Sequence, residues 1–329
     1  MVTADVNVLI SSAGRRVALL RSFRSALRAT AGPGSRVLAA DASELSAAFW
    51  DADESFLVPR CDDPSFVHSM LEICQRERVS VLVPTIDTEL EVYATNQEAF
   101  RDIGTRLLIS SVQVIQIAAD KSLTNRFLRE AGLKTVRQTE PHEPAVDIED
   151  WAFPLIAKPR GGSASVGLRT ISYSHELSAL GRDYIVEEMA PGDEYTIDVF
   201  VDTKGQCQVV VPRRRLEVRA GEVSKGRTQR VPELTQAVRH ACGALPGASG
   251  VLTFQAFFDD TDNSVRIFEI NPRFGSGFPL SLAARADFPT WLIEEQLGQT
   301  SGASDEIWLD GVTMLRYDDA IYRLPVEDR

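Results

Sequence analysis

The sequence predicts an N-terminal α/β domain followed by a separate α+β region. In the first third, short apolar runs such as "VNVLIS" and "VSVLVPT" alternate with amphipathic helical patterns, which is typical of βαβ units and a parallel sheet. From about Phe153 onward, strand patterns follow one another directly, and a polar turn joins "VLTFQAFFDD" to "VRIFEINP". This change from alternating elements to successive strands indicates the second region.

The individual elements follow from the same periodicities. Gly132 is expected to end one helix as a C-cap. The stretch "QVVVPRRRLEV" is expected to be a strand, with Arg219 and Lys225 in a loop after it. Helices are expected over residues 15–29, 64–77, 88–100, 111–118, 120–131, 232–242 and 280–300, and further strands at "SRVLAAD", "TRLLIS", "DYIVEEM", "DEYTIDVFVD" and "GVTMLRY".

Composition narrows the class of protein. The chain has 329 residues, enough for two or three domains, and its 44% hydrophobic and 25% charged residues are ordinary for a soluble globular protein. A formal charge of −12 argues against binding nucleic acid or anionic membranes, although a local cationic pocket can still bind a polyanionic small molecule. The scattered cysteines and histidines form no disulfide framework or zinc motif. With no signal-peptide pattern and no membrane-spanning apolar run, a cytoplasmic location is expected.

A glycine-rich stretch, "AKPRGGSASVG", follows an apolar strand that ends at Lys158. Glycines let backbone N–H groups approach a phosphate closely, and a lysine adds positive charge there. The stretch is not a Walker loop, because G-x-x-x-x-G-K-[ST] is absent. A flexible hairpin with one solvated lysine is the alternative interpretation.

The stretch "VEEMAPGDEYTIDVF" places Glu187 and Glu188 at the end of one strand and Glu194 at the start of the next. The exposed backbone between two strands can hydrogen-bond a flat heterocycle, and a nearby carboxylate can accept two ribose hydroxyls. Taken alone, the stretch is more simply interpreted as an ordinary acidic hairpin.

Three oxygen-bearing side chains, Gln255, Glu269 and Asn271, interrupt two otherwise apolar strands. Burying such groups without partners costs about 2–7 kcal/mol each. A shared hard cation explains them best, because Mg²⁺ takes oxygen ligands and retains phosphate oxygens in its shell. Arg273, just beyond, is in a position to contact a phosphoryl group.

The order of Lys121, Lys158 with its glycine loop, the glutamates, Gln255 and "E-I-N-P-R" resembles the ATP-grasp superfamily. Within it, the chain is most similar to the carbamoyl-phosphate-synthase-like and pyrrolysine-ligase-like branch, from about residue 5 to about residue 300. The resemblance implies a Rossmann-like, pre-ATP-grasp parallel-sheet domain over residues 1–110. A small ATP-grasp lobe with the glycine loop would cover 111–186, and a C-terminal lobe with the Mg²⁺/ATP site would cover 187–329.

The resemblance also implies roles for residues. ATP would lie between the two lobes, with one or two Mg²⁺ ions, for which Mn²⁺ can substitute. Many relatives have an acidic ligand at the position of Gln255, so the number of metals stays open. The implied nucleotide contacts are Lys121, Lys158, Gly161, Gly162, Ser163, Ser165, Glu187, Glu188, Met189 and Glu194; the implied metal ligands are Gln255, Glu269 and Asn271; and Arg273 would face the γ-phosphate or acyl phosphate.

The implied reaction is ATP-dependent ligation of a carboxylate to an amine or thiol through an acyl phosphate, with release of ADP and phosphate. Its partners would be small, amino-acid-like carboxylate and amine substrates, and a homodimer is possible. Catalysis would depend on charge neutralisation and orientation. Arg213 and Arg215 alternate onto one strand face, and we predict that Arg215 and Lys225 contact the substrate carboxylate or phosphate. A solvated basic hairpin is the alternative.

Other functions stay open. One is formation of carbamoyl or carboxy phosphate from bicarbonate, and another is a nucleotide-binding regulatory subunit without turnover. A dinucleotide fold is poorly supported, because "SSAGRR" has one glycine where the fingerprint has three. The resemblance implies that residues at the N-terminal strand ends line the acceptor site, although the last two can instead cap a helix: Ser12, Gly14, Arg15, Asp87 and Glu89.

Overall fold

The computed structural model describes residues 4–141, 151–162 and 167–323. The chain forms two compact units, of which the first comprises Met1–Ile109, Asp287–Ala303 and Arg316–Arg329. The second unit comprises Ser110–Ala286 and Ser304–Leu315. The later part of the chain therefore contributes to both units, whereas the sequence assigned all of 187–329 to one lobe. The bounds of the three predicted domains stay a prediction.

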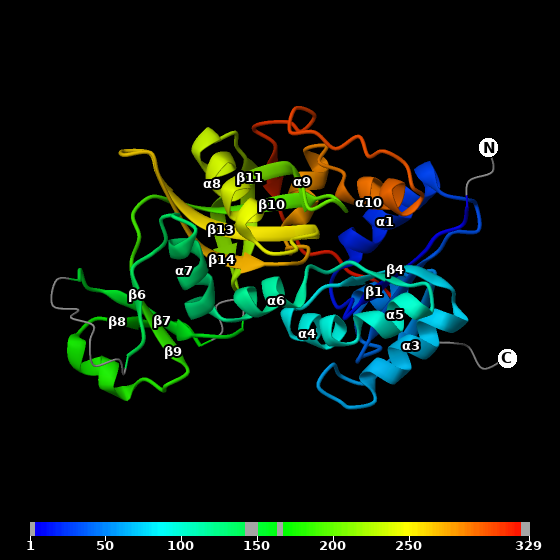
Figure 1. The fold of residues 1–329 in the computed structure, drawn as a ribbon, viewed down its shortest axis with the longest axis horizontal. Helices are drawn as coiled ribbons and strands as arrows, with labels where there is room; N and C mark the ends of the chain where they lie inside the picture. The colour runs from blue at the N-terminus through cyan, green and yellow to red at the C-terminus, as the bar shows by residue number, and fades with distance from the viewer. Residues whose placement is uncertain (1–3, 142–150, 163–166, 324–329) are drawn as a thin grey trace. The chain divides into compact units, whose positions relative to one another are not determined.

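The first unit contains a parallel sheet in the order β3-β2-β1-β4-β5, which confirms the predicted α/β class (Figure 1). The central strands are almost fully buried, as expected when helices cover both faces of a parallel sheet. The strands are β1 (Asn7–Ser11), β2 (Val37–Asp41), β3 (Glu54–Leu57), β4 (Val79–Pro84) and β5 (Arg106–Leu107), and the helices are α1 (Val17–Thr30), α2 (Ala47–Asp51), α3 (Phe66–Arg76), α4 (Asp87–Thr95), α5 (Gln97–Asp102) and α10 (Phe288–Gln296).

Two predicted long helices are each divided in the structure. The expected helix 88–100 breaks at Asn96, whose side-chain amide donates to the carbonyl of Val92 and competes with the helical backbone. The expected helix 280–300 becomes α9 (Phe278–Ala283) and α10. Helix α10 starts anew because the Asp287 carboxylate accepts a hydrogen bond from the backbone of Thr290.

The second unit contains two antiparallel sheets (Figure 1). The larger has the order β14-β13-β10-β11-β12-β15, and the smaller has the order β6-β9-β7-β8. The strands are β6 (Gln138–Thr139), β7 (Leu155–Pro159), β8 (Arg169–Ile171), β9 (Tyr184–Glu188), β10 (Asp193–Val201), β11 (Cys207–Arg219), β12 (Glu222–Thr228), β13 (Gly250–Asp259), β14 (Ser264–Asn271) and β15 (Thr313–Leu315), and the helices are α6 (Val112–Ala119), α7 (Lys121–Glu130), α8 (Pro232–Ala244), α9 and a 3₁₀ helix (Ser174–Ala179).

The predicted loop after β11 is wrong. Arg219 is the last residue of β11, and Lys225 lies within strand β12. The stretch "EVSKGRT" is too polar to read as a strand, yet it pairs with β11 and alternates buried with exposed positions. Gly132, in contrast, has the predicted role: its φ of 74° is left-handed, and its N–H donates to the carbonyl of Arg129.

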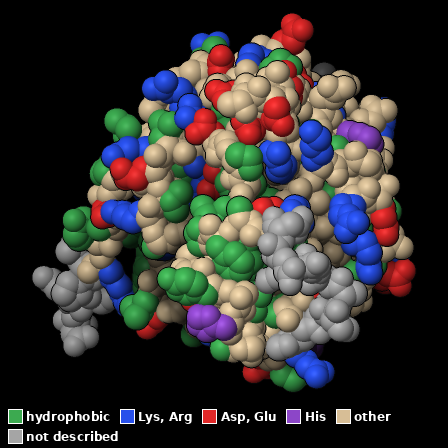
Figure 2. Space-filling model, turned by 90° about the vertical axis from the view of Figure 1, so that its left-hand side faces the viewer, with side chains coloured by type: hydrophobic (Ala, Val, Ile, Leu, Met, Phe, Trp, Pro, Cys, Tyr) green, Lys and Arg blue, Asp and Glu red, His purple; other side chains and the backbone are tan. Residues whose placement is uncertain are grey.

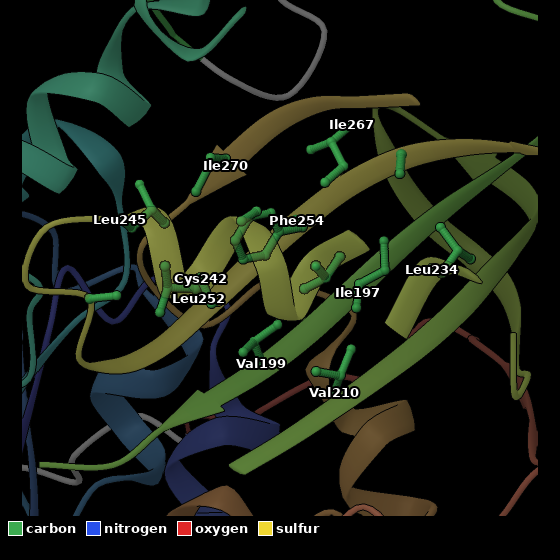
Figure 3. Packing of buried hydrophobic residues seen from close by; sticks show 14 of the residues in the cluster. Ile197, Val199, Val210, Leu234, Cys242, Leu245, Leu252, Phe254, Ile267 and Ile270 are labelled. Carbon is green, nitrogen blue, oxygen red and sulfur yellow. The ribbon is translucent and has the colours of Figure 1, made fainter. Parts of the chain in front are cut away.

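One face of the six-stranded sheet is apolar. Figure 3 shows side chains such as Ile197 and Phe254 from the sheet close to Leu234 and Cys242 from α8. These residues belong to one buried cluster, to which α6 and α7 also contribute. Because side chains alternate along a strand, the other face of the same sheet presents the residues between them.

Figure 2 shows one face of the molecule on which basic and acidic side chains are interspersed. No broad area of a single charge is visible on that face. Within the described ranges, no helix has both the length and the apolar character needed to cross a bilayer.

Candidate functional site

The second face of the six-stranded sheet is polar, and the strand register aligns its side chains. Gln255 lies opposite Glu269 across β13 and β14, and Thr196 on β10 lies opposite Gln255. Residues two apart on a strand lie on the same face, so every second residue along each of these strands belongs to the same face as Gln255 and Glu269. We call the set the polar face: Glu194, Thr196 and Asp198 on β10, Arg213 and Arg215 on β11, Thr253 and Gln255 on β13, and Glu269 and Asn271 on β14.

The predicted metal ligands come together at one end of the polar face. The Asn271 side-chain amide donates to Glu269 Oε1 over 3.0 Å. Asn271 Oδ1 in turn accepts a hydrogen bond from Arg273 Nη2 over 3.3 Å, where the chain turns out of the sheet at Pro272. A carboxylate, an amide oxygen and a guanidinium therefore meet within five residues of sequence.

Arg215 connects Glu194 to Gln255. Its Nη1 atom donates to Glu194 Oε1 over 2.6 Å and to Gln255 Oε1 over 3.3 Å, and its Nη2 donates to the carbonyl of Gly221. Its Nε atom is buried and has no hydrogen-bond partner among the described residues. Burial raises the pKa of Glu194, the Arg215 charge opposes this rise, and the nearby Glu269 charge adds to it.

Lys158 extends from β7 toward the same region. Its ammonium lies 2.7 Å from Glu187 Oε2, and the Glu187 side chain also accepts a hydrogen bond from Gln138. The ammonium lies 5.2 Å from the ring centroid of Phe268 on β14, which is a cation–π distance. Burial raises the pKa of Glu194, and the charge of Lys158 partly opposes this rise, so Lys158 acts electrostatically on the polar face.

Lys121 holds the start of the glycine loop. Its ammonium donates to the carbonyl of Gly162 over 2.7 Å, and only 8% of the residue is exposed. Gly161 and Gly162 are exposed at the end of β7. Ser163 and Ser165 lie outside the described residues.

Three further predicted residues occupy more peripheral positions. Glu188 accepts a hydrogen bond from the backbone of Ala152, and Met189 is 57% exposed beside it. The Lys225 ammonium lies 2.6 Å from Glu217, in a pair with both side chains about half exposed. The structure therefore brings Arg215 to the predicted metal ligands but gives Lys225 an exposed partner on β11, so its substrate contact stays a prediction.

The N-terminal candidates form a network of their own. The Glu89 carboxylate is fully buried and accepts hydrogen bonds from the hydroxyls of Ser11 and Ser12 and from the backbone of Thr85 and Ile86. The structure therefore shows Glu89 capping helix α4, the alternative to an acceptor-site role that the sequence left open. Burial raises the pKa of Glu89, which the hydrogen bonds oppose.

The remaining N-terminal candidates differ in surroundings. Gly14 donates its backbone N–H to the carboxylate of Asp41, which also accepts a hydrogen bond from the backbone of Ser43 and so closes a turn at the end of β2. Gly14 has a φ of 48°, a left-handed conformation that favours glycine. Arg15 is exposed, and Asp87 lies in the first turn of α4.

Sequence reasoning missed a buried ion pair on the polar face. Asp198 is fully buried, and the Arg213 side chain is 2% exposed. Arg213 Nη2 donates to Asp198 Oδ1 over 2.9 Å, and Nε lies 2.8 Å from Oδ2 as an ion-pair contact without hydrogen-bond geometry. The signal in the sequence was a single acidic residue in the apolar stretch "YTIDVFV", the same kind of polar interruption as Gln255, Glu269 and Asn271 in their strands.

The donor set fits a hard divalent cation. Mg²⁺ is usually bound through one or two carboxylates plus phosphate oxygens and water. Glu269 supplies one carboxylate, with amide oxygens of Asn271 and Gln255 on the same face. Across the described ranges, no three His, Cys, Asp or Glu side chains gather as a metal site.

Comparison with known families gives two matches. Residues 8–108 match the family described as "PylC-like, N-terminal domain", and residues 118–277 match the family described as "ATP-grasp domain". Every predicted nucleotide and metal residue lies within the second range.

Curated relatives match over part of their length. The carbamoyl phosphate synthase large chain of Thermotoga maritima is 24% identical over 290 residues, which cover 79% of this chain. The chain spans only 26% of that relative. D-alanine–D-alanine ligase A of Bacillus cereus is 27% identical over 108 residues, which cover 30% of this chain and 34% of the relative.

Solved structures share the fold over nearly the whole chain. Biotin carboxylase of Campylobacter jejuni has a TM-score of 0.71 at 16% identity and covers 92% of this chain and 73% of its own. N5-carboxyaminoimidazole synthetase of Staphylococcus aureus, complexed with ADP, also has a TM-score of 0.71, at 18% identity, with 93% of this chain and 81% of its own covered.

Proposed function

Because the chain belongs to the ATP-grasp superfamily, we propose that it is an ATP- and Mg²⁺-dependent ligase joining a small-molecule carboxylate to an amine. The carboxylate would take the γ-phosphoryl group to give an acyl phosphate, and the amine would displace phosphate to form the amide. Relatives such as D-alanine–D-alanine ligase are named for a reaction of this type.

The observation that carries the proposal is the alignment of Gln255 opposite Glu269, with Asn271 bonded to Glu269. Bound Mg²⁺ would neutralise phosphate charge there. Arg273, bonded to Asn271, is the proposed contact to the transferred phosphoryl group. Bound Mg²⁺ and Arg273 would together put positive charge next to the transferred phosphoryl group, which stabilises the charge that develops during phosphoryl transfer.

Charged residues on and around the polar face support a nucleotide and an anionic substrate. Lys121 and Lys158 are the proposed phosphate contacts, and the Glu187–Met189 segment and Glu194 are the proposed adenosine contacts. The unpartnered Nε of Arg215 is a buried donor that a substrate carboxylate would satisfy, which supports Arg215 as the acid-binding residue. The Arg215–Glu194 pair holds that guanidinium in place before the substrate binds.

The reaction class is tested by product analysis. The purified chain is incubated with Mg²⁺, ATP and pools of amino acids as both acids and amines. ADP and phosphate should appear in a pool-dependent manner, together with an amide detected by mass spectrometry. Release of AMP and pyrophosphate would refute the acyl-phosphate route.

Glu269→Gln tests the metal assignment. The substitution keeps the size of the side chain but removes its charge, so we expect turnover to fall by about 10²-fold or more, a size typical of lost electrostatic stabilisation. Glu130→Gln is the matched control, because Glu130 is exposed at the end of α7. Equal turnover in the two variants would remove Glu269 from the site.

Bicarbonate is the second candidate acceptor. It is supported by the similarity over 290 residues to a carbamoyl phosphate synthase. Pool-independent ADP release that requires added bicarbonate would favour this reaction over amide formation. Nucleotide binding without turnover in any pool would favour the regulatory alternative.

A further inference from the structure

Asp198 gathers side chains from three other elements around one buried carboxylate. Besides Arg213 on β11, Ser281 on α9 donates to Asp198 Oδ2 over 2.6 Å. Thr253 on β13 lies with its hydroxyl 3.3 Å from Oδ1. Both carboxylate oxygens are thus engaged, and the residue is 0% exposed. Asp198 therefore contacts neither solvent nor substrate, and any effect on a reaction must pass through its neighbours.

Thr253 links this carboxylate to the predicted metal site. Its hydroxyl also lies 3.0 Å from the carbonyl oxygen of Arg273, so its single hydrogen is shared between two acceptors. Thr253 is the register partner of Asn271, and the backbone N–H of Arg273 donates to the Asn271 carbonyl. The Asn271–Arg273 turn therefore rests directly on Thr253.

The loop after this turn is shaped to lie against the same ion pair. A Cβ atom at Gly275 would come within 3.1–3.2 Å of the Thr253 side chain, closer than most real contacts. At Gly277 it would overlap the Arg213 guanidinium. Glycine at both positions lets the backbone approach the pair closely. The 273–281 segment therefore packs closely against Asp198 and Arg213. The groups that allow this contact are Gly275, Gly277, Ser281 and the Thr253 hydroxyl.

We propose that Asp198 is a positioning residue that, through Thr253 and Arg213, fixes the Asn271–Arg273 turn against the sheet and so sets the metal- and phosphate-facing side chains. This inference rests on the proposed function for its catalytic meaning. Stability alone does not account for the arrangement, because burying two charges costs desolvation that their attraction often fails to repay. Fixing one orientation of the turn is a role that a well-packed apolar pair does not provide.

The test uses Thr253→Val, which keeps the shape of the side chain and removes its hydroxyl, and Thr253→Ser, which keeps the hydroxyl. Calorimetry measures the Kd of ATP with Mg²⁺ and, separately, with EDTA. We expect Thr253→Val to weaken Mg²⁺-dependent binding about tenfold, the size of one lost buried hydrogen bond, and to leave the EDTA value within about twofold. Thr253→Ser should restore the wild-type values.

A second readout needs no nucleotide. Amide hydrogen exchange of residues 271–281 should accelerate about tenfold in Thr253→Val and more in Asp198→Asn, because the turn loses a buried hydrogen bond. Asp202→Asn is the control, because the Asp202 carboxylate caps the turn after β10 by accepting hydrogen bonds from Lys204, Gln206 and Gln208, which lie outside this segment. Circular dichroism identifies any variant that fails to fold.

The outcomes separate the two proposals. Unchanged exchange in Thr253→Val, or equal loss of binding with Mg²⁺ and with EDTA, would overturn the positioning role. Failure of the wild-type chain to bind ATP would sink the proposed function, while the exchange measurement would still decide whether Asp198 positions the turn.

Discussion

Removing the Asp198 charge should destabilise the second unit strongly, and removing both charges should not. Asp198→Val leaves the Arg213 guanidinium, 2% exposed, without its ion-pair partner. Stranding one member of a buried pair costs about 3–5 kcal/mol. Arg213→Met strands the carboxylate, which keeps the Ser281 and Thr253 hydroxyls, so its cost should lie near the lower bound.

The double variant carries no stranded charge. We expect it to lose no more than about 2 kcal/mol, because apolar replacements of a buried pair are often neutral and only two hydroxyls lose an acceptor. The coupling energy from this double-mutant cycle should therefore be at least about 4 kcal/mol.

Hydrogen exchange of the β10 and β11 amides under native conditions is the assay, because it reports the opening free energy of these strands alone. Global unfolding curves would mix the two compact units. Additive single and double effects, or an Asp198→Val cost below about 1 kcal/mol, would refute the view that this pair is a mutually dependent buried unit.

Three further predictions concern other parts of the chain. Burial raises the pKa of the Glu89 carboxyl group. Its contribution to the free energy of unfolding is therefore complete below the unfolded-state pKa and is lost as pH rises through the folded-state pKa. Glu89→Gln should flatten this decline in the free energy of unfolding above about pH 5. Gly192→Ala should lower the opening free energy of the second unit, measured by native-state hydrogen exchange, by more than about 1 kcal/mol, because φ is 98° and the methyl would overlap the Phe258 carbonyl. Gly243→Ala, unobstructed within α8, should stabilise the same unit slightly. Burial raises the pKa of Cys74 to about 12, so the thiol should resist a disulfide reagent at pH 8 until the protein unfolds.

Much of the fold was predictable because its periodicities are local. Alternating apolar runs and helices gave the parallel sheet, and the i and i+2 spacing placed Glu269 and Asn271 on one face. Strand β12 was missed because charged residues fill its exposed positions, and only its pairing with β11 makes it a strand. The break at Asn96 depends on one side-chain hydrogen bond, which no pattern over a window reveals.

For the site, the sequence predicted which side chains share a strand face but not which partners they contact. Spacing put Arg213 and Arg215 on the same face, but it did not distinguish their partners. Arg213 is neutralised by Asp198, 15 residues earlier on another strand, whereas Arg215 pairs with Glu194 and retains a buried donor. Pairing between strands decides which arginine is held by a buried carboxylate and which retains a buried donor unpaired among the described residues, and a linear pattern carries no information about it.

The two-faced sheet also limits how the gene can change. Neighbouring residues of β13 point to opposite faces of the sheet. The loss or gain of one codon there would therefore put the amide of Gln255 on the apolar face that Phe254 now occupies. Such an indel would disrupt the cluster beneath α8 and the proposed reaction centre together. Descendants of this sequence should therefore vary in the length of their connecting turns while keeping the spacing within β13 and β14 intact.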